Sequence, residues 1–146
     1  MNPKIDPITT EVIRNQILSV VEEMAIALMK SAYSTNIKER RDLSAAVFDA
    51  EGRAIVQGEH LPLHLGSMLG LVKKIREKFS LEKIFPGDIF ISNDPYRGGG
   101  SHLPDVAMAA PVFKDGKLVM FVGNIAHHAD IGGASPGSMA GDMTEI

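Results

Sequence analysis

Residues 105–113 and 118–126 are two apolar segments that only four residues separate, Lys114-Asp115-Gly116-Lys117. An Asp-Gly pair in so short a connection is typical of a tight β-turn, because Gly adopts the positive φ angles that such a turn requires. The pattern predicts two antiparallel strands joined as a hairpin. The start of the first strand then lies beside the end of the second, so residues near 105 and near 127 are expected to meet.

Two further groups of residues predict more strands. Residues 45–49 and 53–57 flank a short connection that contains Gly52, which is typical of a second hairpin. Pro86-Gly87-Asp88 is a turn sequence, and it leads into a short apolar strand at residues 89–92. Most strand pairing is therefore expected to be antiparallel.

A long helix is predicted over about residues 7–33. Asp6 can cap the free amides of its first turn, and Pro7 fits the first helical position. Apolar residues recur at three- and four-residue spacing along it, namely Ile13, Ile17, Val20, Met24 and Leu28, widened by Val21, Ala25 and Met29. Residues 65–79 predict a second amphipathic helix, whose inward residues are expected to be Met68, Leu69, Val72 and Ile75. The expected class is α+β, with a long N-terminal helix packed on mostly antiparallel strands.

Composition excludes several kinds of site and partner. The chain of 146 residues has no cysteine, which rules out a disulfide framework, a thiolate metal site and a Cys nucleophile. Its net charge of -3 provides no general attraction for nucleic acid. No signal sequence and no apolar run long enough to span a bilayer is present. We therefore expect a cytoplasmic protein without a nucleic-acid or membrane partner.

The C-terminal part of the chain concentrates the residues that suit a metal ion. Residues 84–146 hold 7 acidic residues against 3 basic ones. The predicted hairpin brings His102 and Asp105 to the same sheet end as His127-His128-Ala129-Asp130. Two imidazoles with one or two carboxylates suit Zn, Mn or Fe. Spacing alone fits equally well an alternative in which His102 lies in a surface loop and the His pair is half buried and hydrogen-bonded.

Local geometry separates some of these candidates. Neighbouring strand residues face opposite ways, so His127 and His128 should not both be ligands. Asp42 directly precedes an apolar strand at residues 43–48 and could point into the site. His60 and His64 are four residues apart, but the proline between them, Pro62, disfavours the helix that would align them as ligands. For these two we expect a structural or substrate-contact role.

Two glycine-rich segments have more than one interpretation. Gly98–Gly100 could expose amides to a phosphate or let a substrate approach closely, or it could be a flexible turn. Residues 132–138 could form a loop over a site or a plain loop. No P-loop or dinucleotide fingerprint is present.

An ordered series of motifs runs along nearly the whole chain. These motifs are Asp6-Pro7-Ile8-Thr9-Thr10-Glu11-Val12, Arg41-Asp42-Leu43-Ser44, Phe48-Asp49, Gly52-Arg53, His64-Leu65-Gly66-Ser67-Met68, Pro86-Gly87-Asp88, Asn93-Asp94-Pro95-Tyr96, Gly99-Gly100-Ser101-His102-Leu103-Pro104-Asp105 and His127-His128-Ala129-Asp130-Ile131-Gly132-Gly133. Together they strongly resemble the N-terminal region of the hydantoinase B family. That family includes N-methylhydantoinase and 5-oxoprolinase B subunits, caprolactamase, and subunits of acetone and acetophenone carboxylases.

The resemblance implies a divalent metal centre and assigns residues to it. The implied metal ligands are Asp42, His102, Asp105 and His127. His128 and Asp130 are implied as catalytic residues that orient a ligand or move a proton, and Arg97, Gly99 and Gly100 as contacts to a phosphorylated intermediate. Members of the family are several times longer than this chain. Residues 1–146 are therefore expected to be the N-terminal region of a larger hydantoinase B-like subunit.

The activity that the resemblance implies is ATP-dependent opening of hydantoin, 5-oxoproline or lactam rings. A hydantoinase A-type partner would bind ATP and phosphorylate the small cyclic amide, and this subunit would form a hetero-oligomer with it. Two alternatives stay open at this point. The chain could belong to an ATP-dependent acetone or acetophenone carboxylase, or it could be a non-catalytic assembly fragment.

Overall fold

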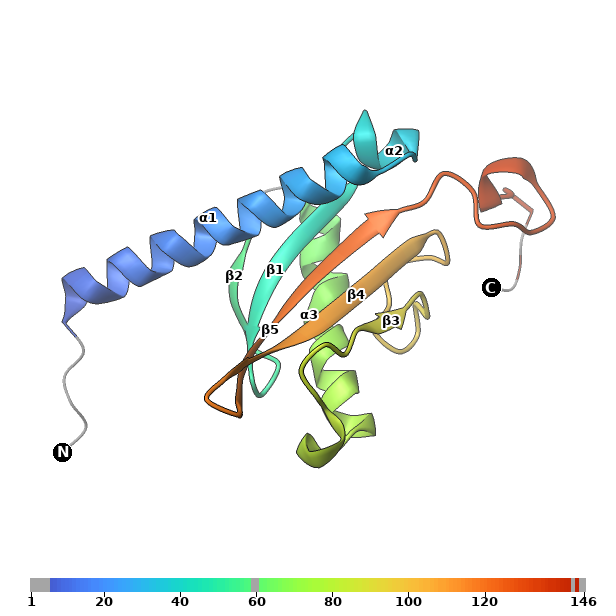
Figure 1. The fold of residues 1–146 in the computed structure, drawn as a ribbon. Coiled ribbons are helices and arrows are strands. Elements are labelled where there is room, and N and C mark those ends of the chain that lie inside the picture. The colour runs from blue at the N-terminus through green and yellow to red at the C-terminus, as the bar shows by residue number, and fades with distance from the viewer. Residues whose placement is uncertain (1–5, 59–60, 143, 145–146) are drawn as a thin grey trace.

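The computed structural model describes residues 6–58, 61–142 and 144, and its centre is a five-stranded antiparallel sheet (Figure 1). The sheet order is β2-β1-β5-β4-β3. The strands are β1 (Leu43–Asp49), β2 (Ala54–Gln57), β3 (Phe90–Ser92), β4 (Asp105–Lys114) and β5 (Lys117–His127). Every neighbouring pair is antiparallel. The predicted α+β class is confirmed.

The predicted hairpin between β4 and β5 forms the longest ladder of the sheet. Asp115 and Gly116 in its turn have φ angles of 51° and 73°, which explains why a glycine stands there. At the other end of the ladder, Asp105 pairs with His127. The turn therefore determines that Asp105 and His127 stand opposite each other at the far end of the hairpin.

Three α-helices accompany the sheet, α1 (Pro7–Ser31), α2 (Thr35–Lys38) and α3 (Pro62–Lys78), with short 3-10 turns at Leu81–Lys83 and Pro136–Ser138. The Asp6 carboxylate accepts a hydrogen bond from the Thr9 amide at 3.0 Å and caps α1 as predicted. α1 ends at Ser31, two residues before the expected end. α2 was not predicted, and α3 begins three residues earlier than expected because Pro62 occupies its first turn.

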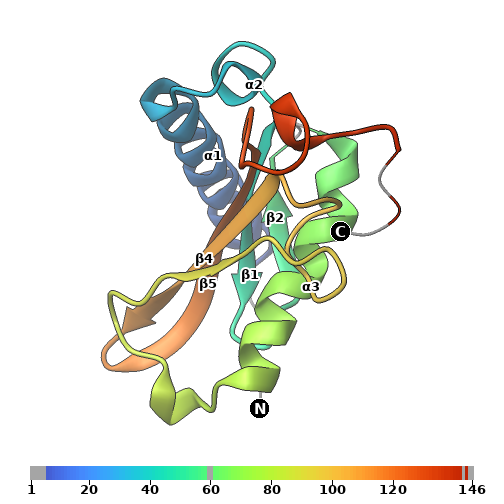
Figure 2. The same ribbon diagram turned by 90° about the vertical axis from the view of Figure 1, so that its right-hand side faces the viewer.

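The helices cover opposite faces of the sheet (Figures 1 and 2). β1 shows how the chain separates the two layers. Ala45 and Val47 face α1, whereas Ala46 and Phe48 face α3. Because both faces are covered, six consecutive residues of β1 are buried.

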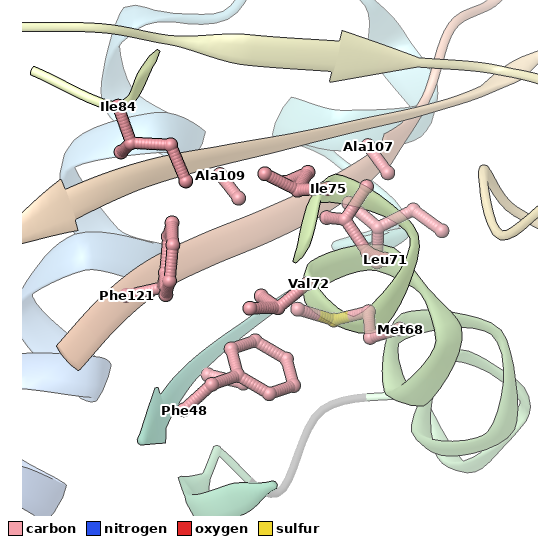
Figure 3. Packing of buried hydrophobic residues seen from close by; sticks show 11 residues of the cluster. Phe48, Met68, Leu71, Val72, Ile75, Ile84, Ala107, Ala109 and Phe121 are labelled. Atoms are coloured by element: carbon pink, nitrogen blue, oxygen red, sulfur yellow. The ribbon is translucent and has the colours of Figure 1, made fainter. Parts of the chain in front are cut away.

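The core between the sheet and α3 holds the large aromatic side chains Phe48 and Phe121 (Figure 3). From α3 it takes Met68, Leu71, Val72 and Ile75, while Leu69, expected inside, is 51% exposed. A second core lies under α1 and includes Val21, Ala25, Leu43, Ala45 and Val47.

Most of the predicted apolar stripe of α1 packs on the sheet. Val21 and Ala25 are buried, and four more residues of the stripe pack against the same core, namely Ile17, Met24, Leu28 and Met29. Ile13 and Val20, also predicted to pack, are each 47% exposed, so the spacing identified the packed side but not its full extent. No helix among the described residues is long and apolar enough to cross a membrane.

We expect Phe121→Ala to lower the free energy of unfolding by about 3–5 kcal/mol, because it empties a fully buried position of the main core. Phe85→Ala is the matched control, since Phe85 is 59% exposed, and it should change stability by less than about 0.5 kcal/mol. Urea denaturation of both variants measures the difference. Equal losses would contradict this account of the core.

Candidate metal centre

The ends of three neighbouring strands meet at one edge of the sheet, where β1 and β4 begin and β5 ends. Asp105 pairs with His127, and the His127 amide donates to the Asp42 carbonyl at 3.0 Å. Strand alternation places all three residues on the α3 face, in line with Ser44, Ala107 and Ile125. Asp42, His127 and Asp105 therefore lie side by side on three adjacent strands.

His102, Asp105 and His127 form the compact group of this edge. One possible ligand atom from each lies within 4.8 Å of the others. His102 Nε2 is 3.3 Å from Asp105 Oδ1, and the rings of His102 and His127 are 4.8 Å apart between centroids. Two imidazoles and one carboxylate are donors that Zn, Mn and Fe accept. The donor set therefore fits a divalent metal ion.

Asp105 is almost completely buried, yet its carboxylate is well supported. Burial alone would raise the pKa of Asp105. Oδ2 accepts hydrogen bonds from the Ser101 amide at 2.9 Å and the Ser101 hydroxyl at 2.8 Å. Together with the nearby His102 and His64, these bonds hold the pKa of Asp105 below its ordinary value. The carboxylate is therefore ionised at neutral pH, as a metal ligand must be.

Glycine makes this support possible. Gly100 has a φ of +108°, and a side chain there would collide with Cβ of Asp105 and approach its carbonyl oxygen to 3.0 Å. Gly99 is equally confined, because a side chain there would meet the Ser92 hydroxyl and the Asn93 amide. The space beside both residues, predicted as substrate contacts, is filled by protein. Close packing of the loop therefore explains why glycine occupies positions 99 and 100.

His64, for which the sequence predicts a structural or substrate-contact role, lies within this site. Its ring is 1% exposed, and Nε2 lies 3.5 Å from Asp42 Oδ1 and 3.9 Å from Asp105 Oδ1. Pro62 was expected to prevent a helix here, but proline is compatible with the first turn, and α3 begins at that residue. The helix then carries His64 under the strand ends. His60 lies outside the described residues.

The environment of His64 favours the neutral ring. Burial lowers the pKa of His64 below its ordinary value, against the opposing effect of the Asp105 and Asp42 carboxylates. Nδ1 lies 3.1 Å from the Ser44 hydroxyl.

Asn36 on α2 also belongs to this site, and nothing in the sequence indicated that role. Its side-chain amide lies 2.7 Å from Nδ1 of His127, which leaves Nε2 of that ring for the cluster. An amide group can present either its nitrogen or its oxygen, and the oxygen would accept a proton from Nδ1. A hydrogen-bond partner on the second nitrogen is the usual support of a metal-binding imidazole. A four-residue helix rich in polar residues gives no sequence signal for this role.

The two residues predicted as catalytic lie outside the compact group. His128 is exposed, on the opposite side of the strand end from buried His127, as strand alternation requires. The Asp130 carboxylate accepts hydrogen bonds from the amides of Gly132 and Gly137 and from the Ser138 hydroxyl. These bonds lower the pKa of Asp130 and tie the ends of its loop together.

Two cavities border residues that the sequence predicted as functional, and one of them is lined by His102. One of about 310 Å³ lies between His102, Leu103 and Pro104 and the loop of residues 131–140. Arg97 instead borders a cavity of about 580 Å³ between α3 and β3, and its side chain is 82% exposed. The first cavity is the one that a small molecule could use to reach His102.

An antiparallel sheet that gathers two imidazoles and a buried carboxylate at one edge defines a candidate metal-binding protein. The chain belongs to the Hydantoinase B/oxoprolinase family, whose model matches residues 6–146. The family resemblance carried by the sequence motifs is confirmed.

Relatives of known name and structure support the same placement. The 5-oxoprolinase of Saccharomyces cerevisiae is 40% identical over 143 residues, which are 97% of this chain and 11% of the relative. A nucleotide-free acetone carboxylase structure matches 94% of this chain and 18% of its own, with a TM-score of 0.84 and 26% identity. The ATP-dependent caprolactamase of Pseudomonas jessenii matches 92% of this chain and 23% of its own, with a TM-score of 0.79 and 35% identity.

The chain spans between 10% and 25% of the length of the curated relatives that it matches. The described cluster draws all its residues from this short span.

We expect Gly100→Ala to destabilise the protein by about 1–3 kcal/mol more than Gly87→Ala, because it must displace Asp105 in a packed site. Gly87 is the matched control. It also has a positive φ, +93°, but nothing lies within 4 Å of an added side chain, so both variants share the cost of the strained backbone. Urea denaturation measures the free energy of unfolding. Equal losses would show that backbone strain alone matters at Gly100.

Proposed function

We propose that this chain is the metal-binding N-terminal region of a subunit of an ATP-dependent cyclic amidohydrolase. The observation that carries the proposal is the cluster of His102, Asp105 and His127 at the sheet edge. Relatives named 5-oxoprolinase and caprolactamase support cyclic amides as the substrate class. The proposed enzyme is cytoplasmic and acts on hydantoin, 5-oxoproline or lactam rings.

The proposed ligands are Asp42, His102, Asp105 and His127, holding Zn, Mn or Fe. A divalent ion bound there would polarise an oxygen of the substrate and lower the pKa of a bound water. Asp105 is ionised and fixed by Ser101, and Asn36 orients the ring of His127. These contacts fix the orientation of two of the four proposed ligands, Asp105 and His127.

Roles for the remaining predicted residues follow from their positions. Exposed His128 could move a proton at the rim of the site, and Asp130 would position the loop that walls the cavity beside His102. Arg97, Gly99 and Gly100 are kept as proposed contacts to a phosphorylated intermediate. Arg97 would make this contact with its exposed guanidinium group, whereas the two glycines could use only backbone amides.

ATP would be bound by a hydantoinase A-type partner subunit rather than by this chain, which has no P-loop sequence. A ring amide is a poor electrophile at neutral pH, and phosphorylation of its oxygen would make it susceptible to water. The two subunits would therefore form a hetero-oligomer and divide the reaction between them. The two structural neighbours, an acetone carboxylase and a caprolactamase, are ATP-dependent enzymes, which supports this division.

A ketone carboxylase is the second candidate, because the acetone carboxylase structure has the higher TM-score of the two neighbours, 0.84 against 0.79. The caprolactamase has the higher sequence identity, 35% against 26%, and we therefore place the cyclic amides first. A non-catalytic assembly piece is the third candidate.

We expect the intact protein with its partner subunit to open a cyclic amide and hydrolyse ATP without added ketone or bicarbonate. Chromatographic detection of the ring-opened acid, with 5-oxoproline, hydantoin and caprolactam as substrates, measures this. Bicarbonate-dependent consumption of acetone or acetophenone would instead establish the carboxylase. A metal-free complex that lacks both activities would favour the assembly role.

Metal content separates the two adjacent histidines. We expect His127→Ala to weaken metal binding by more than the roughly 10- to 100-fold that loss of a supporting group costs. His128→Ala should retain the metal, because that ring is exposed and lies outside the cluster. Metal analysis of both purified variants, with His102→Ala for comparison, provides the measurement. Loss of metal from His128→Ala alone would transfer the ligand role to His128.

A further inference from the structure

His64 links Asp42 to the rest of the candidate metal centre. Among the described residues, the compact group contains His102, Asp105 and His127 but not Asp42. Nε2 of His64 lies between the two carboxylates, 3.5 Å from Asp42 Oδ1 and 3.9 Å from Asp105 Oδ1. Both distances exceed that of a direct hydrogen bond, so the ring faces both oxygens and is committed to neither.

The other ring nitrogen indicates where the proton of His64 resides. A neutral imidazole has one N–H donor and one acceptor nitrogen. The Ser44 oxygen accepts from the Leu61 amide at 3.4 Å and lies 3.1 Å from Nδ1 of His64. With its oxygen already accepting, the Ser44 hydroxyl is free to donate its proton to Nδ1. If the hydroxyl donates to Nδ1, the imidazole proton is on Nε2.

The charges around Nε2 favour the same tautomer. Nε2 faces an oxygen of each of the Asp42 and Asp105 carboxylates, and a carboxylate without a proton only accepts hydrogen bonds. A lone pair on Nε2 would face the oxygens of two carboxylates, which is repulsive, whereas an N–H would be attracted to both. The tautomer with the proton on Nδ1 is therefore the alternative that an experiment has to exclude.

We propose that His64 is a positioning residue whose Nε2–H lies between the Asp42 and Asp105 carboxylates, attracts both and keeps them side by side, without being a metal ligand itself. This inference rests on the proposed metal centre. It specifies the structural role of a buried imidazole for which the sequence left a structural and a substrate-contact role open. It also explains how Asp42, which directly precedes β1, is kept close to Asp105 on β4.

The first test measures Co²⁺ binding by the intact protein and two variants. His64→Leu removes the donor and should raise the Co²⁺ dissociation constant by about 10- to 100-fold. His64→Gln places an amide N–H near the position of Nε2 and should largely restore affinity. Leu63→Gln, at a 62% exposed position of the same helix, is the matched control and should not change it.

The Co²⁺ absorption spectrum separates positioning from ligation. For a positioning residue, His64→Leu keeps the band positions of the wild type once it is saturated, whereas His102→Ala shifts them. A shift in His64→Leu like that of His102→Ala would make His64 a ligand and overturn the inference. Unchanged affinity in His64→Leu would also overturn it. A wild-type protein that binds no Co²⁺ would instead refute the metal centre itself.

The second test needs neither a metal ion nor a variant that folds. Nitrogen chemical shifts of ¹⁵N-histidine-labelled wild-type protein identify which ring nitrogen of His64 carries the proton. We expect the proton on Nε2. A proton on Nδ1 would overturn the inference, whatever the metal measurements show.

Discussion

Backbone hydrogen bonds along β5 fix which residues of β1 and β4 stand opposite it, and the candidate site depends on this register. β5 pairs with β1 on one side and with β4 on the other. A shift of one residue in either pairing would turn every side chain of the shifted strand to the other face. Large buried side chains such as Phe121 oppose such a shift, so the core holds the site in register.

A buried carboxylate is costly unless hydrogen bonds and neighbouring charges compensate it. Asp105 meets that condition through Ser101, and the loop that carries Ser101 approaches closely because Gly100 has no side chain. The polar groups continue directly from the apolar core on the same face of the sheet, where Ala107 and Ile125 follow Asp105 and His127. The core excludes water from one side of the cluster, and the cavity beside His102 leaves another side open.

The proposed division of labour between subunits agrees with what this region contains. Its described residues bring three potential metal ligands together, while its sequence has no motif for binding nucleotide phosphates. The chain spans at most a quarter of its curated relatives, yet the donors of the cluster all lie between residues 102 and 127. The proposed ligand Asp42 and the positioning residue His64 come from earlier in the chain and reach the cluster through β1 and α3.

The sequence by itself determined the hairpin of β4 and β5, the start of α1 and the family. Each depends on neighbouring residues, such as the Asp-Gly turn and the Asp6 cap, whose conformational preferences are local. The hairpin alone was enough to predict that His102 and Asp105 would meet His127. Tertiary structure decided which residues of the α1 stripe are buried, Val21 rather than Val20, and the positions of Asn36 and His64. Those residues reach the site through helices that dock from distant parts of the chain, and their contacts depend on packing that no local spacing encodes.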